Sequence, residues 1–294
     1  LLDAIGTRPS LKYIDAILMQ DRDGRRIALK ASPLPVPFRL APSLFRIPWL
    51  GWKDRLAAAR LMQRIPRDTN DPGALEYLDL ATWANRNGAT PGLIRGLLEP
   101  IVVSACNAGL SAVSAKMGFA VLDQLLLRSP DGHRPGIFTK PLGEVFTEPV
   151  QAAAARSGGT VRLRTNVTAV LRGGPARYRV MLGRHGEITA SACVLAVPWN
   201  AVPRLLPTDA LTDGIMKAAK LLRPGTIVST HHWFADQLDC PEALALIGRS
   251  VHWIFNKSVT FGPGYGDGCY VTTVTSDANE LGRLDGADIL RGDA

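Results

Sequence analysis

Hydrophobic and polar positions follow recognisable periods along most of the chain, and turn residues separate the periodic segments. Residues 13–30 predict a β-hairpin, because apolar and alternating positions flank the turn sequence Asp-Arg-Asp-Gly at residues 21–24. Apolar residues three and four positions apart predict an amphipathic helix over residues 52–65. The first quarter of the chain is therefore expected to combine a hairpin with a helix.

Capping residues mark the starts of the helices that follow. Asp79 is suited to cap a helix over residues 80–87, and Thr90 followed by Pro91 is suited to begin another. This second helix, GLIRGLLEPIVVSACN, is apolar nearly all round, so we expect it to be buried. Ser111 begins a third predicted helix, and a fourth opens at Pro141 and ends at Ser157-Gly158.

Short strands dominate the next part of the sequence. Residues 161–170 and 178–182 predict extended segments, and the small apolar run at residues 192–196 predicts a strand buried on both faces that Pro198 ends. A short helix at residues 211–220 then precedes strands at 225–234, 251–255 and 269–274. The pattern as a whole predicts a mixed α/β fold with an antiparallel sheet and helices beside it.

The net charge of +8 is concentrated near the start of the chain, where residues 1–70 hold 13 basic and 6 acidic residues. Exposed aromatic residues between arginines favour an anionic membrane surface over nucleic acid as the partner. The aromatic residues that we expect at such a surface are Phe38, Phe45, Trp49 and Trp52. The alternative is a proline-rich loop that packs on its own protein.

Cysteine and histidine spacing predicts neither a disulfide framework nor a metal site. The four cysteines are far apart, and His231 and His232 point to opposite faces of a predicted strand. The sequence contains no signal peptide and no run of 18 apolar residues, so we expect an intracellular protein, at most peripheral to a membrane. It begins without methionine in the last turns of a helix, which predicts an internal piece of a longer protein.

Two titratable residues are candidates for acid–base chemistry. Glu99 is a carboxylate in an apolar helix, where burial would raise its pKa and make it a proton donor. A helix-terminal polar contact is an equally ordinary role for it. His252 stands in an otherwise apolar strand, where a hydrogen-bonded core histidine is the usual alternative to a catalytic one.

Six segments in register resemble one family of flavoproteins. They are DLATWANRNG, LLEPIVVSACN, GGTVRLRTNVTAV, CVLAVPWNAVPRLLP, GTIVSTHHWF and SVHWIFNKS. Their order is similar to that of the bacterial hydroxysqualene dehydroxylases, also described as squalene-associated FAD-dependent desaturases, within the amine oxidase and phytoene desaturase superfamily. The resemblance covers essentially the whole chain.

The resemblance implies a fold, a cofactor and a substrate class. It implies part of an FAD-binding Rossmann-like domain, with an inserted helical and antiparallel-sheet substrate domain. The backbone at Val167 would meet the adenine of FAD, and Ala196, Val197 and Pro198 would lie beside the cofactor. Trp253 and Phe255 would line a tunnel for a long isoprenoid. Residues 1–140 and 207–294 would form the two parts of the substrate domain, and residues 141–206 the middle of the FAD domain.

The implied activity is the reductive removal of the hydroxyl of hydroxysqualene, which gives squalene for hopanoid synthesis. It would take place in the cytoplasm at the inner membrane. The glycine fingerprint G-x-G-x-x-G of dinucleotide-binding folds is missing from this chain, so we expect the chain alone to be inactive. A related flavin desaturase or oxidase, or a non-catalytic lipid-binding module, remains an alternative.

Overall fold

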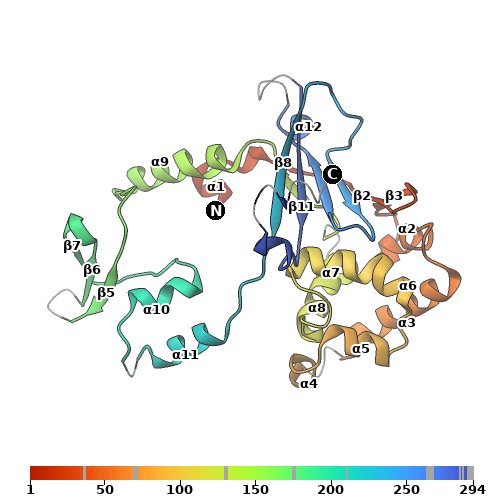
Figure 1. Ribbon diagram of the computed structural model, residues 1–294, viewed down its shortest axis with the longest axis horizontal. Coiled ribbons are helices and arrows are strands. Elements are labelled where there is room, and N and C mark those ends of the chain that lie inside the picture. The colour runs from red at the N-terminus through yellow and green to blue at the C-terminus, as the bar shows by residue number, and fades with distance from the viewer. Residues whose placement is uncertain are drawn as a thin grey trace. The chain divides into compact units, whose positions relative to one another are not determined.

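The computed structural model describes residues 1–35, 38–68, 72–128, 132–173, 177–209, 211–262, 268–284, 286 and 288–289. The chain forms two compact units, of which the smaller, Gln151–Pro224, is inserted into the larger, Leu1–Val150 with Gly225–Ala294 (Figure 1). The edges of these units do not coincide with the boundaries predicted at residues 140 and 206. The roles assigned to those ranges stay predictions.

Helices make up much of the larger unit. Its α-helices are α1 (Leu2–Ile5), α2 (Ala41–Phe45), α3 (Trp52–Asp68), α4 (Pro72–Glu76), α5 (Leu80–Arg86), α6 (Pro91–Leu93), α7 (Glu99–Cys106), α8 (Ala115–Leu122) and α12 (Lys257–Phe261). Turns of π-helix occupy Ile94–Leu98 and Asp123–Arg128, and 3₁₀ turns occupy Arg8–Ser10, Phe38–Leu40 and Leu281–Arg283.

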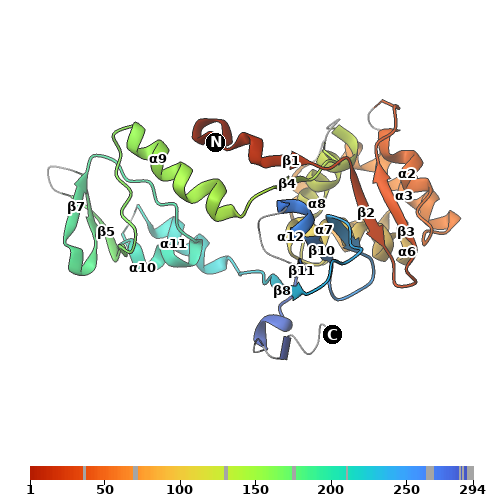
Figure 2. The same cartoon turned by 90° about the horizontal axis from the view of Figure 1, so that it is seen from above.

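A six-stranded sheet forms the other layer of the larger unit (Figure 2). Its strands, in spatial order, are β3 (Arg26–Lys30), β2 (Ala16–Gln20), β9 (Ala243–Leu246), β10 (Trp253–Asn256), β11 (Cys269–Thr275) and β8 (Val228–Phe234). Neighbouring strands are antiparallel except β2 and β9, which are parallel. A separate ribbon pairs β1 (Leu11–Tyr13) with β4 (Gly136–Phe138). The mixed fold and the antiparallel sheet predicted from the sequence are therefore present.

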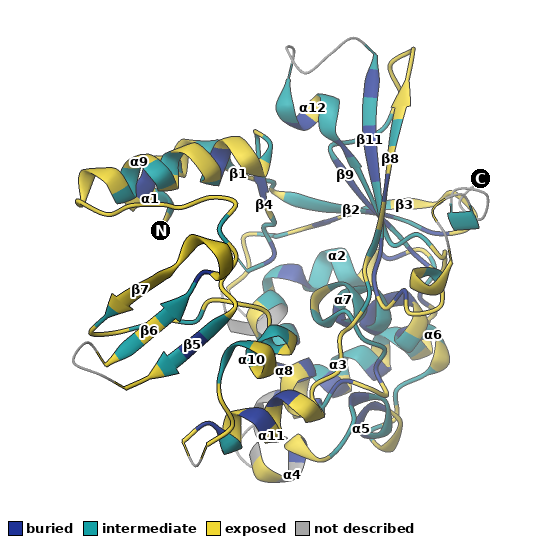
Figure 3. Cartoon of the chain, turned by 60° about the vertical axis from the view of Figure 1, so that its left-hand side comes forward, coloured by how far each residue is buried: buried dark blue, intermediate teal, exposed yellow. Residues whose placement is uncertain are grey.

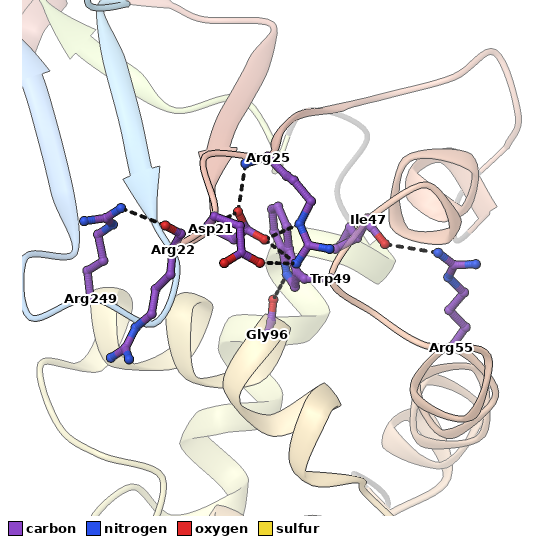
Figure 4. Close-up of polar contacts among 9 residues, drawn as sticks. Asp21, Arg22, Arg25, Ile47, Trp49, Arg55, Gly96 and Arg249 are labelled. Carbon is purple, nitrogen blue, oxygen red and sulfur yellow. Dashed lines mark hydrogen bonds and ion pairs between the residues drawn. The ribbon is translucent and has the colours of Figure 1, made fainter.

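The predicted hairpin is formed by β2 and β3, and its turn is closed by Asp21. The carboxylate accepts hydrogen bonds from the backbone N–H groups of Asp23 and Arg25 at 3.1 and 2.8 Å, and from the Arg25 guanidinium at 2.7 Å (Figure 4). Burial of Asp21 opposes its ionisation, but the bonds from Arg25 outweigh this and hold its pKa below the usual value. The charged turn thus fixes the register of the hairpin.

Side-chain caps set the helix starts largely where the sequence places them. Asp79 accepts a hydrogen bond from the N–H of Thr82, and the Thr90 hydroxyl accepts one from the N–H of Leu93. The start predicted at Ser111 is wrong. Ser114 caps α8 instead, through a bond from the N–H of Met117, because residues 107–113 form turns before the helix.

The hydrophobic core lies among α3, α5, α7 and α8 (Figure 3). The predicted face of α3 is buried through Leu61 and Ile65, and the rings of Trp83 and Phe119 meet edge to face at 4.5 Å. The apolar helix containing α7 is not buried all round, contrary to expectation. Val102 is buried, whereas Ile101, Ser104 and Ala105 line a cavity on another side of the helix. The cavity explains why this helix is apolar beyond its packed face.

The smaller unit contains a three-stranded antiparallel meander. Its elements are α9 (Glu148–Arg156), which begins at the junction with the larger unit after a π-helical turn (Gly143–Thr147), β5 (Ala169–Arg172), β6 (Tyr178–Met181), β7 (Glu187–Ala190), α10 (Val202–Leu205) and α11 (Asp213–Leu221), with 3₁₀ turns at Gly183–His185 and Trp199–Ala201. The helix predicted to end at Ser157-Gly158 does so, since Gly158 has a φ of 74°.

One strand predicted in this unit is not formed, and another, predicted at residues 161–170, begins only at Ala169, the first residue of β5. Residues 161–168 and 192–196 are irregular, and Val194 is 90% exposed rather than buried on both faces. A strand exists only when another strand pairs with its backbone, and among the described residues no strand pairs with either segment. Their apolar side chains therefore stay at the surface.

Candidate functional site

The cavity beside α7 lies between that helix and one face of the six-stranded sheet, within the larger unit. It encloses about 710 Å³. The sheet contributes Ile17, Met19, Leu29, Ala243, Ala245, Trp253, Phe255 and Val274, and α7 contributes Pro100, Ile101, Ser104 and Ala105. Its polar side chains are Ser104, Gln124 and Ser276, and no charged side chain of the described residues lines it. We call this the apolar cavity.

A second cavity, of about 860 Å³, adjoins the first and is lined by charged groups. Pro100, Ser104, Ala245, Trp253 and Ser276 line both cavities and so form the wall between them. The charged and titratable side chains of the second cavity are Arg22, Arg95, Glu99, Arg249, His252, Asp277 and Glu280. We call this the charged cavity. Part of its rim is fixed by a hydrogen bond of 3.1 Å from the Arg249 guanidinium to the carbonyl of Arg22 (Figure 4).

His252, one of the two candidate acid–base residues, is held at the wall of the charged cavity. Its Nδ1 accepts a hydrogen bond of 3.1 Å from the N–H of Ser276, which leaves the ring proton on Nε2. Burial lowers the pKa of His252, and the nearby Asp277 only partly opposes this. The imidazole is thus a neutral hydrogen-bond donor near pH 7. The geometry does not test a catalytic role, which stays a prediction.

Glu99 lies in the same cavity as His252. It is the first residue of α7, directly after the π-helical turn, and its side chain is half-buried. The fold thus brings together the two titratable candidates, although 153 positions separate them in the sequence. A carboxyl group and an imidazole in one cavity are side chains of the types used for acid–base chemistry.

Trp253 and Phe255, the predicted tunnel residues, both line the apolar cavity. Their rings stack at 5.7 Å with an interplanar angle of 8°. The indole N–H of Trp253 donates a hydrogen bond of 2.8 Å to the Ser104 hydroxyl, which ties the sheet to α7. The structure places both residues at the wall of the apolar cavity, and their contact with a substrate stays a prediction.

Sequence reasoning missed Lys257, which follows the predicted tunnel residues. Its ammonium group lies 5.3 Å from the Phe255 ring and 5.4 Å from the Phe261 ring, and burial lowers its pKa. The two phenylalanines spaced around the lysine were the available signal. Lys257 brings a partly buried cation to the end of β10.

The segments expected to meet FAD lie in the smaller unit. Val167 and Val197 are exposed, and Ala196 also lies at the surface in an irregular segment before Pro198. These residues fit a bound flavin in one respect: an exposed, small, apolar surface with backbone groups outside any strand can receive an adenosine and a ring system. Cofactor contact at these four positions stays a prediction.

The four aromatic residues of the proline-rich segment expected at a membrane differ in their exposure to solvent. Phe38, Phe45 and Trp52 are exposed, and Lys53 lies 5.6 Å from the Trp52 ring. Trp49 is instead half-buried against the core, and its N–H donates a 3.0 Å hydrogen bond to the carbonyl of Gly96 (Figure 4). Trp49 therefore anchors the segment to the protein, and the other three aromatic residues remain candidates for membrane contact.

The described part of the chain contains no cluster of three or more His, Cys, Asp or Glu side chains able to hold a metal ion. All four cysteines are free thiols. Within the same residues, no helix is long and apolar enough to cross a membrane.

Residues 7–290 match the flavin containing amine oxidoreductase family, and the chain belongs to it. Two hydroxysqualene dehydroxylases are similar in sequence. The chain is 26% identical to that of Sinorhizobium fredii over 218 residues, which cover 69% of this chain and 50% of that protein. It is 28% identical to that of Rhodopseudomonas palustris over 162 residues, which cover 54% and 37%. The chain thus spans half or less of the length of these relatives.

Solved structures show the same fold. Putrescine oxidase bound to putrescine matches with a TM-score of 0.64 at 14% identity, over 98% of this chain and 64% of that one. An oxidoreductase from Methanosarcina mazei matches with a TM-score of 0.69 at 14% identity, over 96% and 65%. These matches confirm the predicted fold class, and the sequence relatives confirm the resemblance found in the six segments.

Proposed function

We propose that the intact protein is an FAD-dependent oxidoreductase that acts on a long isoprenoid. The reaction that we propose is the reductive dehydroxylation of hydroxysqualene to squalene, as a step of hopanoid synthesis. Family membership and the names of the two sequence relatives support the reaction class. The observation that carries the substrate class is the apolar cavity.

The apolar cavity has the size and lining that a hydrocarbon chain needs. Ligand pockets span roughly 300–1,000 Å³ and are mostly apolar, and this cavity of about 710 Å³ falls within that range. Because no charged side chain of the described residues lines it, a polyamine would leave its ammonium groups unpaired there. A branched hydrocarbon would instead bury its surface against Ile17, Phe255 and Ile101.

The residues of this chain would position the substrate and supply a proton. The stacked rings of Trp253 and Phe255 would hold the isoprenoid against the sheet, and His252 and Glu99 would stand behind the Trp253 wall, in the charged cavity. Bound reduced FAD would supply the hydride that replaces the hydroxyl. Val167 and the segment of residues 196–198 are the parts of this chain that would hold the cofactor.

We further propose that the protein binds the inner membrane peripherally from the cytoplasm, where an isoprenoid dissolves. Support comes from the exposed Phe38, Phe45 and Trp52 in a segment where residues 31–67 hold seven basic residues and one acid. Such a surface would place the substrate domain against its substrate.

Product analysis of the intact protein tests the reaction. With prereduced flavin and hydroxysqualene, we expect squalene as the product. Unchanged hydroxysqualene, with desaturation of a tested polyene such as phytoene, would support a related desaturase instead. Intact protein without bound flavin would contradict the proposal of an FAD-dependent oxidoreductase and favour a lipid-binding module.

A further inference from the structure

The sheet face that lines the apolar cavity continues beyond it, across β11 to β8. Residues paired across strands share a face of the sheet, and Phe255 pairs with Thr272, which pairs with His231. Strand spacing is about 4.8 Å, so His231 lies two spacings, about 10 Å, from the cavity-lining Phe255. The same face therefore leads from the cavity to the edge strand β8.

Three rings form a row at this end of the face: His231, Trp233 and Tyr270, which we call the aromatic row. Trp233 and Tyr270 are cross-strand partners, and their rings stack at 4.9 Å and 2°. The His231 ring stacks on Tyr270 at 5.9 Å and on Trp233 at 6.2 Å. Trp233 is nevertheless 70% exposed. Its strand, β8, is the edge strand of the sheet among the described residues (Figure 3). Core packing does not account for such an exposed stack.

The aromatic row also contains a proton-carrying pair. Nδ1 of His231 and the hydroxyl of Tyr270 share a hydrogen bond of 2.7 Å, in which either group can donate. An exposed imidazole bonded to a phenol can take a proton from water and pass it to the phenol oxygen. The ring faces of Trp233 and Tyr270 stand next to this pair.

The position between the cavity and the aromatic row carries an unsatisfied polar group. Thr272 is 5% exposed, and its buried hydroxyl has no hydrogen-bond partner among the described residues. A buried hydroxyl without a partner costs stability, so it marks a place where a polar group of a ligand can bind. It lies on the same face as Phe255 and His231.

We propose that the aromatic row is the reaction end of the isoprenoid site, with Tyr270 as the proton donor and His231 as the group that reprotonates it. This inference rests on the proposed function. The Tyr270 hydroxyl gives its proton to the substrate hydroxyl as the allylic C–O bond breaks, and water leaves. The electron pair of that bond leaves with the water, and the carbon left cationic would take the hydride that reduced FAD, when bound, would supply. His231 returns a proton to Tyr270 from solvent.

The rings of the aromatic row have a second part in this step. An allylic carbon that loses hydroxide carries positive charge, and the faces of tryptophan and tyrosine attract a cation. The substrate chain would extend along the sheet face into the apolar cavity, with its hydroxyl near Thr272. His232, on the opposite face, bonds to Thr230 at 2.8 Å and serves as a matched control.

Single-turnover rates in the intact protein test the proton donor. Tyr270→Phe keeps the ring and removes the hydroxyl, so we expect squalene formation to slow by about 100-fold or more with little change in KM. His232→Gln should stay within a few-fold of the wild type. A Tyr270→Phe rate as fast as that of His232→Gln would overturn the proton-donor assignment.

A binding measurement tests the aromatic row without turnover. Farnesyl trimethylammonium imitates the allylic cation, and farnesol is its neutral counterpart. By calorimetry, Trp233→Leu should lower the affinity for farnesyl trimethylammonium about tenfold and leave the affinity for farnesol unchanged. Tyr270→Phe should change neither affinity. Equal ammonium affinity in wild type and Trp233→Leu would overturn the cation site. Should the wild type form no squalene, the proposed function fails, and this measurement still decides whether the row binds a cation.

Discussion

At the scale of single residues, His252 shows how burial decides what a side chain does. Its lowered pKa follows from loss of water, and its Nδ1 is occupied by the backbone of Ser276. The residue is thus neutral in the folded protein and is protonated more readily in the unfolded chain. The two states differ in bound protons over a pH range that an experiment can reach.

We therefore expect His252 to make stability depend on pH. Below the ordinary histidine pKa of 6.5, the unfolded chain binds more protons than the folded one, so the free energy of unfolding falls as the pH is lowered. His252→Asn keeps a side-chain acceptor for Ser276 and should flatten this dependence in urea unfolding between pH 7 and 5. The same change at the exposed His185 should leave the dependence in place. An unchanged slope in His252→Asn would contradict the buried neutral state.

At the scale of elements, two tryptophans of the proline-rich segment have different roles, although the composition of the segment suggests the same role for both. Trp49 and Trp52 are three residues apart, yet one bonds to Gly96 and packs on the core while the other is 70% exposed. A proline-rich stretch gives no periodicity from which to assign each ring to a side. The tertiary contact with the π-helical turn makes the distinction.

The two tryptophans give a matched pair of variants in the intact protein. Trp52→Ser should lower sedimentation with anionic vesicles and leave the melting temperature nearly unchanged, because the ring is at the surface. Trp49→Ser should lower the free energy of unfolding by about 2 kcal/mol through lost packing and an unpaired Gly96 carbonyl. Vesicle binding by Trp52→Ser equal to that of wild type would argue against membrane insertion at this position.

The sequence predicts an element well where the interactions that form the element lie within a few neighbouring residues. The Asp21 turn and the Asp79 cap are complete within a few residues, so the β2–β3 hairpin and α5 were found. Strand β9, with the sequence Ala-Leu-Ala-Leu, was missed because its residues show no β-branched signal and because one of its two partners, β2, is far away in the chain. The strand predicted at residues 192–196 is absent for the converse reason: its apolar sequence has no pairing strand among the described residues.

The candidate site was only partly predictable for the same reason. Glu99 and His252 stand out in the sequence, and Trp253 and Phe255 through the family resemblance. The sequence contains no sign that the first two share a cavity or that Trp253 separates two cavities. The pair of His231 and Tyr270 depends on strand register between β8 and β11. Register comes from pairing over 39 positions, which periodicity does not encode.

At the scale of the whole molecule, the fold of a flavoprotein is present without the glycine fingerprint that cradles the pyrophosphate of FAD. We expect the isolated 294-residue chain not to retain FAD, because a helix N-terminus after that glycine turn normally holds the phosphates. An absorbance spectrum of the purified chain checks this. Stoichiometric bound flavin would show that the exposed segments around Val167 and Ala196 are sufficient for binding.

The central claim is that the intact protein reduces an isoprenoid alcohol, and flavin reoxidation tests it most directly. The enzyme, reduced and held under anaerobic conditions, is mixed with hydroxysqualene while the flavin absorbance is followed. The account predicts that one equivalent of flavin is reoxidised for each squalene formed, and that omitting the alcohol leaves the flavin reduced. Flavin that stays reduced in the presence of hydroxysqualene, with the alcohol recovered unchanged, would contradict it.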